Sequence, residues 1–101
     1  MVACTVSGST ITVGTNASVD NSGAGLYTSL CRLSDTKFVY AYQDTTNTDT
    51  SSRCGTVSGT TITLGTEVEL NTQSCFTSVA MIGTDKVLYF YATGANGYAR
   101  V

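Results

Sequence analysis

Two matching stretches decide the fold of this chain: TVSGSTITVGT at residues 5–15 and TVSGTTITLGT at residues 56–66. They lie 51 residues apart and differ only at Ser9/Thr60 and Val13/Leu64. A second match, 49 residues apart, joins Lys37–Tyr42 to Lys86–Tyr91. We infer an internal duplication, and a period near 50 residues in a strand-rich chain is typical of propeller blades.

Each unit is predicted to hold four antiparallel strands, because Thr, Val and Tyr alternate between Gly-rich turns. Gly8 and Gly59 each supply a hairpin turn, since Gly adopts positive φ at little cost. The expected strand regions are Val2–Val19 (a hairpin of two strands), Tyr27–Ser34, Lys37–Gln43, Ser52–Ser58, Thr61–Leu70, Phe76–Gly83, Lys86–Thr93 and a stub at Tyr98–Val101.

The units are out of phase with the chain ends, which predicts assembly as well as fold. We expect an all-β protein in which residues 1–101 form a single domain of two four-stranded propeller blades. Residues 27–70 make one blade, and 1–19 with 76–101 make the equivalent of the other across the chain ends. Two blades alone leave strand edges exposed, so a homo-oligomer should complete the propeller. Head-to-tail contacts give a ring, with a six-bladed trimer favoured, or an open filament.

Three segments resemble known repeats: Gly55–Glu69, Asp85–Tyr91 and Tyr98–Val101. They are similar to the tandem, propeller-like repeats of surface and phage tail-fibre-like proteins, which implies an adhesive or structural role. The arrangement of two blades per chain also resembles small lectins that trimerise into six-bladed propellers. The absence of Trp departs from those lectins, whose sugar sites rely on Trp.

Charge and hydropathy exclude several partners. The net charge is −2, and the five basic residues are scattered, so we expect no nucleic-acid partner. No apolar run approaches the length of a membrane span, and no membrane insertion is expected. No signal peptide is visible at Met1–Thr5. The resemblance and the cysteines nevertheless favour an extracellular location, or the surface of a cell or virion.

Catalysis is not expected. The chain has no His, which removes Ser-His and Cys-His dyads and His-based metal sites. Two carboxylate pairs, Asp44/Asp49 and Glu67/Glu69, are interpreted as solvated groups rather than a general acid and base. We predict no enzyme activity, no catalytic residue, no metal and no cofactor.

Four cysteines, Cys4, Cys31, Cys54 and Cys75, are disulfide candidates because they are expected in the same half of the molecule. They allow three connectivities, and a bridge between Cys54 and Cys75 is preferred. Buried free thiols are the alternative. Asn16 begins an Asn-Ala-Ser sequon and is a glycosylation candidate.

Loop lengths indicate where a ligand would bind. Connections at Asp20–Leu26, Asp44–Ser51, Asn71–Ser74 and Gly94–Gly97 are expected to be long and to share one face, opposite the short turns. Short amides and carboxylates beside Tyr rings suit sugar hydroxyls and ring C–H surfaces. The candidate ligand-binding residues are Asp20, Asn21, Tyr27, Tyr42, Asp44, Asn71, Asn96 and Tyr98.

The function predicted from these features is a non-catalytic adhesion module that binds glycans. A structural protein that builds an extracellular fibre, or acts as a spacer, is the alternative. An engineered two-blade propeller fragment also fits the permuted ends.

Overall fold

The computed structural model describes residues 1–19, 25–73 and 76–101. Within these ranges the chain forms antiparallel strands and turns, with no helix, as the all-β prediction requires. The strands are β1 (Val2–Ser7), β2 (Thr10–Asn16), β3 (Gly25–Arg32), β4 (Lys37–Asp44), β5 (Asp49–Ser58), β6 (Thr61–Leu64), β7 (Val68–Asn71), β8 (Phe76–Met81), β9 (Val87–Thr93) and β10 (Asn96–Arg100).

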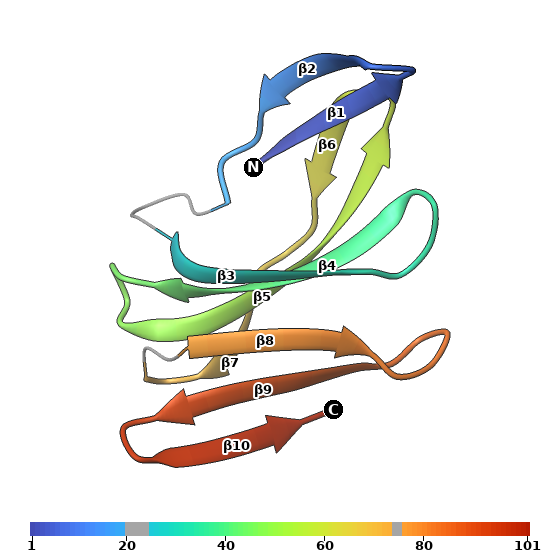
Figure 1. The fold of residues 1–101 in the computed structure, drawn as a ribbon. Coiled ribbons are helices and arrows are strands. Elements are labelled where there is room, and N and C mark those ends of the chain that lie inside the picture. The colour runs from blue at the N-terminus through green and yellow to red at the C-terminus, as the bar shows by residue number, and fades with distance from the viewer. Residues whose placement is uncertain (20–24, 74–75) are drawn as a thin grey trace.

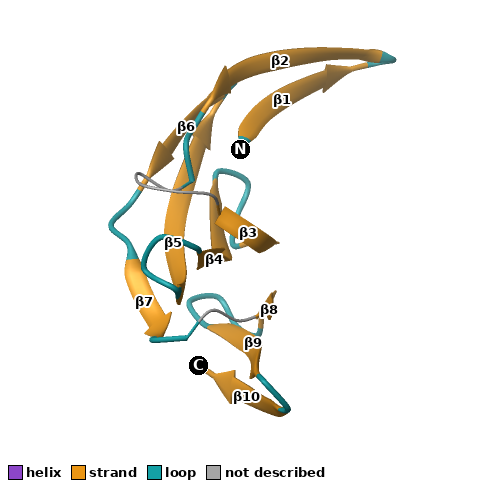
Figure 2. Ribbon diagram, turned by 90° about the vertical axis from the view of Figure 1, so that its left-hand side faces the viewer, coloured by secondary structure: helices purple, strands orange, loops and turns teal. Residues whose placement is uncertain are grey.

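These strands form three separate sheets, none of them closed (Figure 1). The N-terminal hairpin is β1–β2, and the C-terminal sheet has the order β8–β9–β10. The central sheet has the order β3–β4–β5–β6, with β7 also pairing with β5. Figure 2 shows the central sheet between the other two, with β3 and β8 side by side. The described strands of one chain therefore form no closed propeller.

The fourth strand of the central unit is interrupted. Sequence predicted one strand over Thr61–Leu70, but β6 ends at Leu64 and β7 begins at Val68. β5 is long enough to pair with both pieces: its first half pairs with β7 and its second half with β6. At the break, the Gly65 N–H donates to the Cys54 carbonyl at 2.8 Å.

The duplicated segments share one pairing register. Cys4 lies opposite Val13 in the hairpin, as Gly55 lies opposite Leu64 in the central sheet. Gly8 and Gly59 turn the two hairpins with φ of +59° and +58°, as predicted. The N-terminal hairpin therefore has the same local structure as β5–β6.

The core lies on both faces of β4. Phe38, Tyr40 and Tyr42 form a cluster on one face. It packs against Met1 and Val19, which flank the N-terminal hairpin, and against Val57, Ile62 and Leu64 of β5 and β6. Val39 packs on the opposite face with Cys31 and with Val79 of the C-terminal sheet. Because successive side chains alternate between faces, a strand with apolar residues at nearly every position is buried from both sides. β4 therefore holds the three sheets together.

Two turns are shorter than predicted. β5 begins at Asp49 rather than Ser52, and β10 is a strand from Asn96 rather than a stub from Tyr98. Thr48 and Gly94 both have φ of +58°, which lets the chain reverse within four and two residues respectively. The expected contrast between long loops on one face and short turns on the other is wrong for these two connections.

Candidate functional site

A polar network of Tyr42, Ser51, Arg53 and Glu67 occupies the break in the fourth strand. The Arg53 Nη2 and Nε atoms donate to Glu67 Oε2 at 2.6 and 3.2 Å. The Tyr42 hydroxyl donates to the same oxygen, and Ser51 Oγ lies 3.4 Å from Oε1. One carboxylate thus accepts hydrogen bonds from β4 and from β5, and ties the start of β7 to both strands.

The network is an ion pair at neutral pH. Hydrogen bonds from Tyr42 and Arg53 lower the pKa of Glu67 below its ordinary value of 4.5. Burial and the Glu67 contact raise the pKa of Tyr42 well above 10. The hydrogen bond to Glu67 likewise raises the pKa of Arg53. None of these shifts brings a group toward neutral pH, so the network is suited to holding the sheet rather than transferring protons.

The interpretation of both carboxylate pairs as solvated groups needs correction. Glu67 is partly buried in its ion pair, whereas Glu69 is exposed as expected. Asp44 and Asp49 are both buried. Asp49 accepts from Ser51 Oγ at 3.2 Å, and burial raises its pKa above the ordinary value of 3.8. Sequence reasoning missed these contacts because they depend on how the turns fold back.

Asp44 shapes the turn between β4 and β5. Its Oδ1 accepts from the Thr46 N–H at 2.7 Å, and its Oδ2 accepts from Asn47 Nδ2 at 2.7 Å. Side-chain acceptors of this kind replace backbone partners in tight turns. These bonds explain why the turn is shorter than predicted. Both carboxylate oxygens of Asp44 therefore accept hydrogen bonds within the turn. A role of Asp44 in ligand binding stays a prediction.

The predicted tyrosines have different surroundings. Tyr42 is fully buried and stacks on Tyr40, with ring centroids 5.4 Å apart. Tyr98 is 45% exposed and stacks on Tyr91 at 5.6 Å. Tyr27 is exposed, with φ of +48°, and its carbonyl accepts from the Thr77 hydroxyl at 3.0 Å. Of the three, Tyr27 and Tyr98 present ring surface to solvent.

Several predicted residues gather at one edge, which we call the turn edge. It comprises the β4–β5 turn, the β9–β10 turn and the end of β7, all on the left of Figure 1. It carries Asp44, Asn71, the exposed Asn96 and, further along β10, Tyr98. Asn71 Oδ1 accepts from the Gln73 N–H at 2.8 Å. Asp20 and Asn21 lie outside the described residues.

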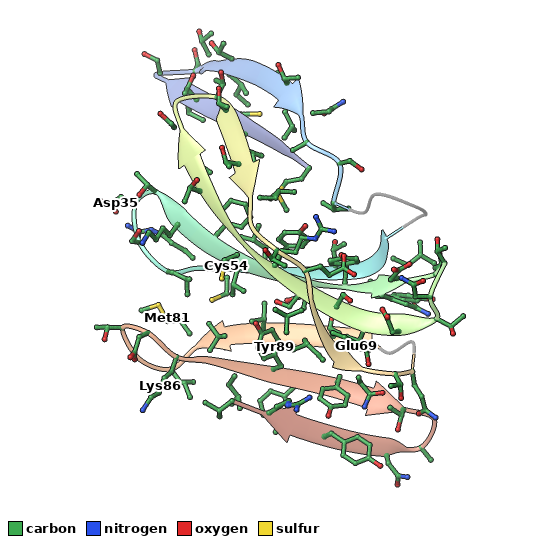
Figure 3. The ribbon with its side chains drawn as sticks, turned by 180° about the vertical axis from the view of Figure 1, so that it is seen from behind. Asp35, Cys54, Glu69, Met81, Lys86 and Tyr89 are labelled. Carbon is green, nitrogen blue, oxygen red and sulfur yellow. The ribbon has the colours of Figure 1, made fainter. Side chains whose placement is uncertain are left out.

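The described cysteines carry free thiols: Cys4, Cys31 and Cys54. Val39 lies between Cys31 and Cys54 in the sheet, which separates these two by two strand spacings, about 9–10 Å, too far for a disulfide. Cys75 lies outside the described residues, and Cys54, its preferred partner, is unbridged. Figure 3 shows Cys54 and Tyr89 between the central and C-terminal sheets.

Other predicted features can also be placed. Asn16, the sequon residue, is exposed at the end of β2. Among the described residues, no group of three or more His, Cys, Asp or Glu side chains is arranged to hold a metal ion. Over the same residues, no helix is long and apolar enough to cross a membrane.

Two arginines in equivalent positions were missed as contact residues. Arg53 binds Glu67, and Arg100 Nη1 donates to the Leu70 carbonyl at 2.6 Å. Arg53 and Arg100 occupy the same register position, opposite Tyr40 and Tyr89. An arginine repeated inside a strand, in a chain with five basic residues, was the signal that could have identified them.

Comparison with known proteins adds no relative. The chain matches no protein-family model, and neither the curated proteins nor the solved structures give a match.

Proposed function

We propose that this chain is a non-catalytic adhesion module that works as a homo-oligomeric β-propeller and binds glycans at its turn edge. The single observation that carries the ligand proposal is the exposed Tyr98, stacked on Tyr91 beside Asn96. Asn96 and Tyr98 are two residues apart in β10, so they share a face of the strand. An aromatic face next to an amide suits a sugar ring and its hydroxyls.

Placement on a rigid scaffold supports this proposal. Tyr91 lies directly opposite Tyr98 in the β9–β10 pair. The two-residue turn at 94–95 holds this pair close to the connection between the strands. A preorganised aromatic platform loses little conformational freedom when a ligand binds. Individual sites of this kind are weak, and several copies in an oligomer would raise the avidity. An adhesive role fits a protein displayed on a cell or virion surface.

Binding to a printed array of bacterial and mammalian oligosaccharides tests the ligand proposal. The oligomeric protein should bind a defined set of glycans. Tyr98→Ala should remove that binding, because it removes the exposed ring. Tyr98→Phe should retain most of it, because it keeps the ring and loses only the hydroxyl. No binding by the wild-type oligomer, or equal binding by all three proteins, would contradict the proposal.

A fibre or spacer is the second candidate function. The two ends of the chain differ, since one is a two-stranded hairpin and the other a three-stranded sheet. Contacts between unlike ends are head-to-tail, and such contacts give rings only when the rotation closes. Electron microscopy separates the two functions: discrete rings support the propeller, and filaments support the fibre.

A further inference from the structure

The two end sheets are complementary pieces of the central sheet. β10 occupies the register of the first half of β5, because Arg100 opposite Tyr89 repeats Arg53 opposite Tyr40. β1 occupies the register of the second half, with Cys4 in the place of Gly55. Between them, β10 and β1 cover the positions of β5, and they overlap at the position of Arg53, to which both Arg100 and Val2 correspond.

Exposed fractions show what the N-terminal hairpin lacks. Its outer face carries Val6, Ile11 and Val13, which are 71%, 64% and 66% exposed. The equivalent residues of the central sheet, Val57, Ile62 and Leu64, are partly buried against the Phe38 cluster. The same apolar stripe is partly buried in one copy of the repeat and exposed in the other. We infer that the exposed stripe lacks a neighbour.

The same difference appears between the central and C-terminal sheets. Leu30 of the central sheet is 56% exposed, while its equivalent Val79 is 7% exposed. Phe90 of the C-terminal sheet is 53% exposed, while its equivalent Ala41 is fully buried. Within one chain, the face of the central sheet that carries Ala41 packs against the face of the C-terminal sheet that carries Val79. Leu30 lies opposite Tyr40, on the face of the Phe38 cluster, and the part of that face around Leu30 is exposed. Phe90 is likewise exposed, on the face equivalent to the covered Ala41 face.

A groove and two strand edges of the chain are available for contact with another sheet. In the part of the chain that the structure describes, β1 pairs with β2 alone. β10 pairs with β9 from Tyr89 to Thr93, and no described strand pairs with Val87 and Leu88 on that side. Beside β1 runs a hollow of about 250 Å³, lined by residues that include Ala3, Leu30 and Ile62.

We propose that the C-terminal sheet of a second copy docks in this groove and pairs with β1 in the register of β4–β5. Val87 of the second copy then lies opposite Cys4, as Phe38 lies opposite Gly55. Leu88 and Phe90 of the second copy cover Leu30. The hairpin thereby completes the C-terminal sheet of its neighbour. This inference rests on the homo-oligomer of the proposed function and is independent of the glycan.

Val87→Cys tests the register through the native Cys4. Directly opposed residues in antiparallel strands have Cβ atoms about 4.5–5.5 Å apart, close enough for a disulfide after small adjustment. Mild oxidation should link chains, and replacing Cys4 by Ser in the same variant should abolish the link. Leu88→Cys is the matched control, because its side chain points to the other face. The largest linked species distinguishes a closed ring from a filament.

Sedimentation of two lysine variants keeps the test decisive if Val87→Cys fails to fold. Ile11→Lys, on the bare apolar face, should dissociate the assembly, whereas Ser9→Lys, in the exposed turn, should leave it intact. An oligomer without a Cys4-dependent link, or one unaffected by Ile11→Lys, would overturn this interface and leave the homo-oligomer standing. A wild-type monomer at every concentration would overturn both. Linked chains that bind no glycan would support the interface and contradict only the ligand proposal.

Discussion

Replacing Glu67 by Gln tests whether the polar network stabilises the central sheet. The substitution keeps the shape of the side chain and one acceptor oxygen, but it removes the charge. Arg53 and Glu67 side chains are 12% and 29% exposed, so the ion pair is largely shielded from water. Hydrogen bonds to charged groups contribute about 1.5–3 kcal/mol when they are shielded. Allowing for the exposed part of Glu67, we expect a loss of about 2 kcal/mol, within the range of that principle.

The loss should appear in thermal unfolding at pH 7 and at fixed protein concentration. For a domain of this size, about 2 kcal/mol corresponds to a fall in Tm of about 8–16 °C. Glu69→Gln is the matched control, because Glu69 lies only two residues further along, in β7, and is exposed. It should change the Tm little.

The pH dependence supplies the second half of the test. Hydrogen bonds from Tyr42 and Arg53 lower the pKa of Glu67 in the folded protein below 4.5. A lowered pKa stabilises the folded state above the ordinary pKa, and this stabilisation is lost as the pH falls through the folded pKa. The difference between wild type and Glu67→Gln should therefore be full near neutral pH and shrink below about pH 4.5. Equal stability at pH 7, or a difference that persists in acid, would refute this reasoning.

Three further predictions concern the packing at Gly55 and the partly buried Tyr89. A Cβ at Gly55 would lie 2.2 Å from the Phe38 ring, so Gly55→Ala should destabilise the protein by about 1–3 kcal/mol in urea unfolding. Gly97→Ala meets nothing within 4 Å and should be nearly neutral; equal effects would contradict the packing. Tyr89→Phe removes a 2.9 Å hydrogen bond to Ser52 and should cost about 1 kcal/mol. Burial raises the pKa of Tyr89 above the ordinary value of 10.0, so its phenol should ionise at a higher pH than a free tyrosine. The stability of the folded protein should fall as the pH rises through that range. Ionisation at the ordinary value would contradict the burial of Tyr89.

Periodicity and turn residues were enough to predict the all-β fold and most of its strands. The all-β fold, the burial of β4 from both sides and the hairpins at Gly8 and Gly59 follow from local rules of alternation and backbone conformation. These features depend on neighbours within a few residues, and the sequence contains that information directly.

Contacts across the fold could not be predicted in the same way. Glu67 was interpreted as solvated because it was placed on the solvent face of one strand over Thr61–Leu70, yet the break after Leu64 turns it toward Arg53. Asp44 was assigned to a long polar loop, but its carboxylate bonds with its own turn and shortens it. Both outcomes depend on three-dimensional neighbours that the strand pattern leaves open.

Hydrogen exchange of the β1 amides tests the central claim most directly, because β1 pairs with β2 alone among the strands that the structure describes. Peptides that cover Val2–Ser7 can be compared with peptides that cover Asp49–Ser58, where β5 is paired on both sides. If a second copy completes the sheet, β1 should be protected as strongly as β5 at high concentration and should lose protection on dilution. Rapid exchange of β1 at every concentration, with β5 still protected, would contradict the account.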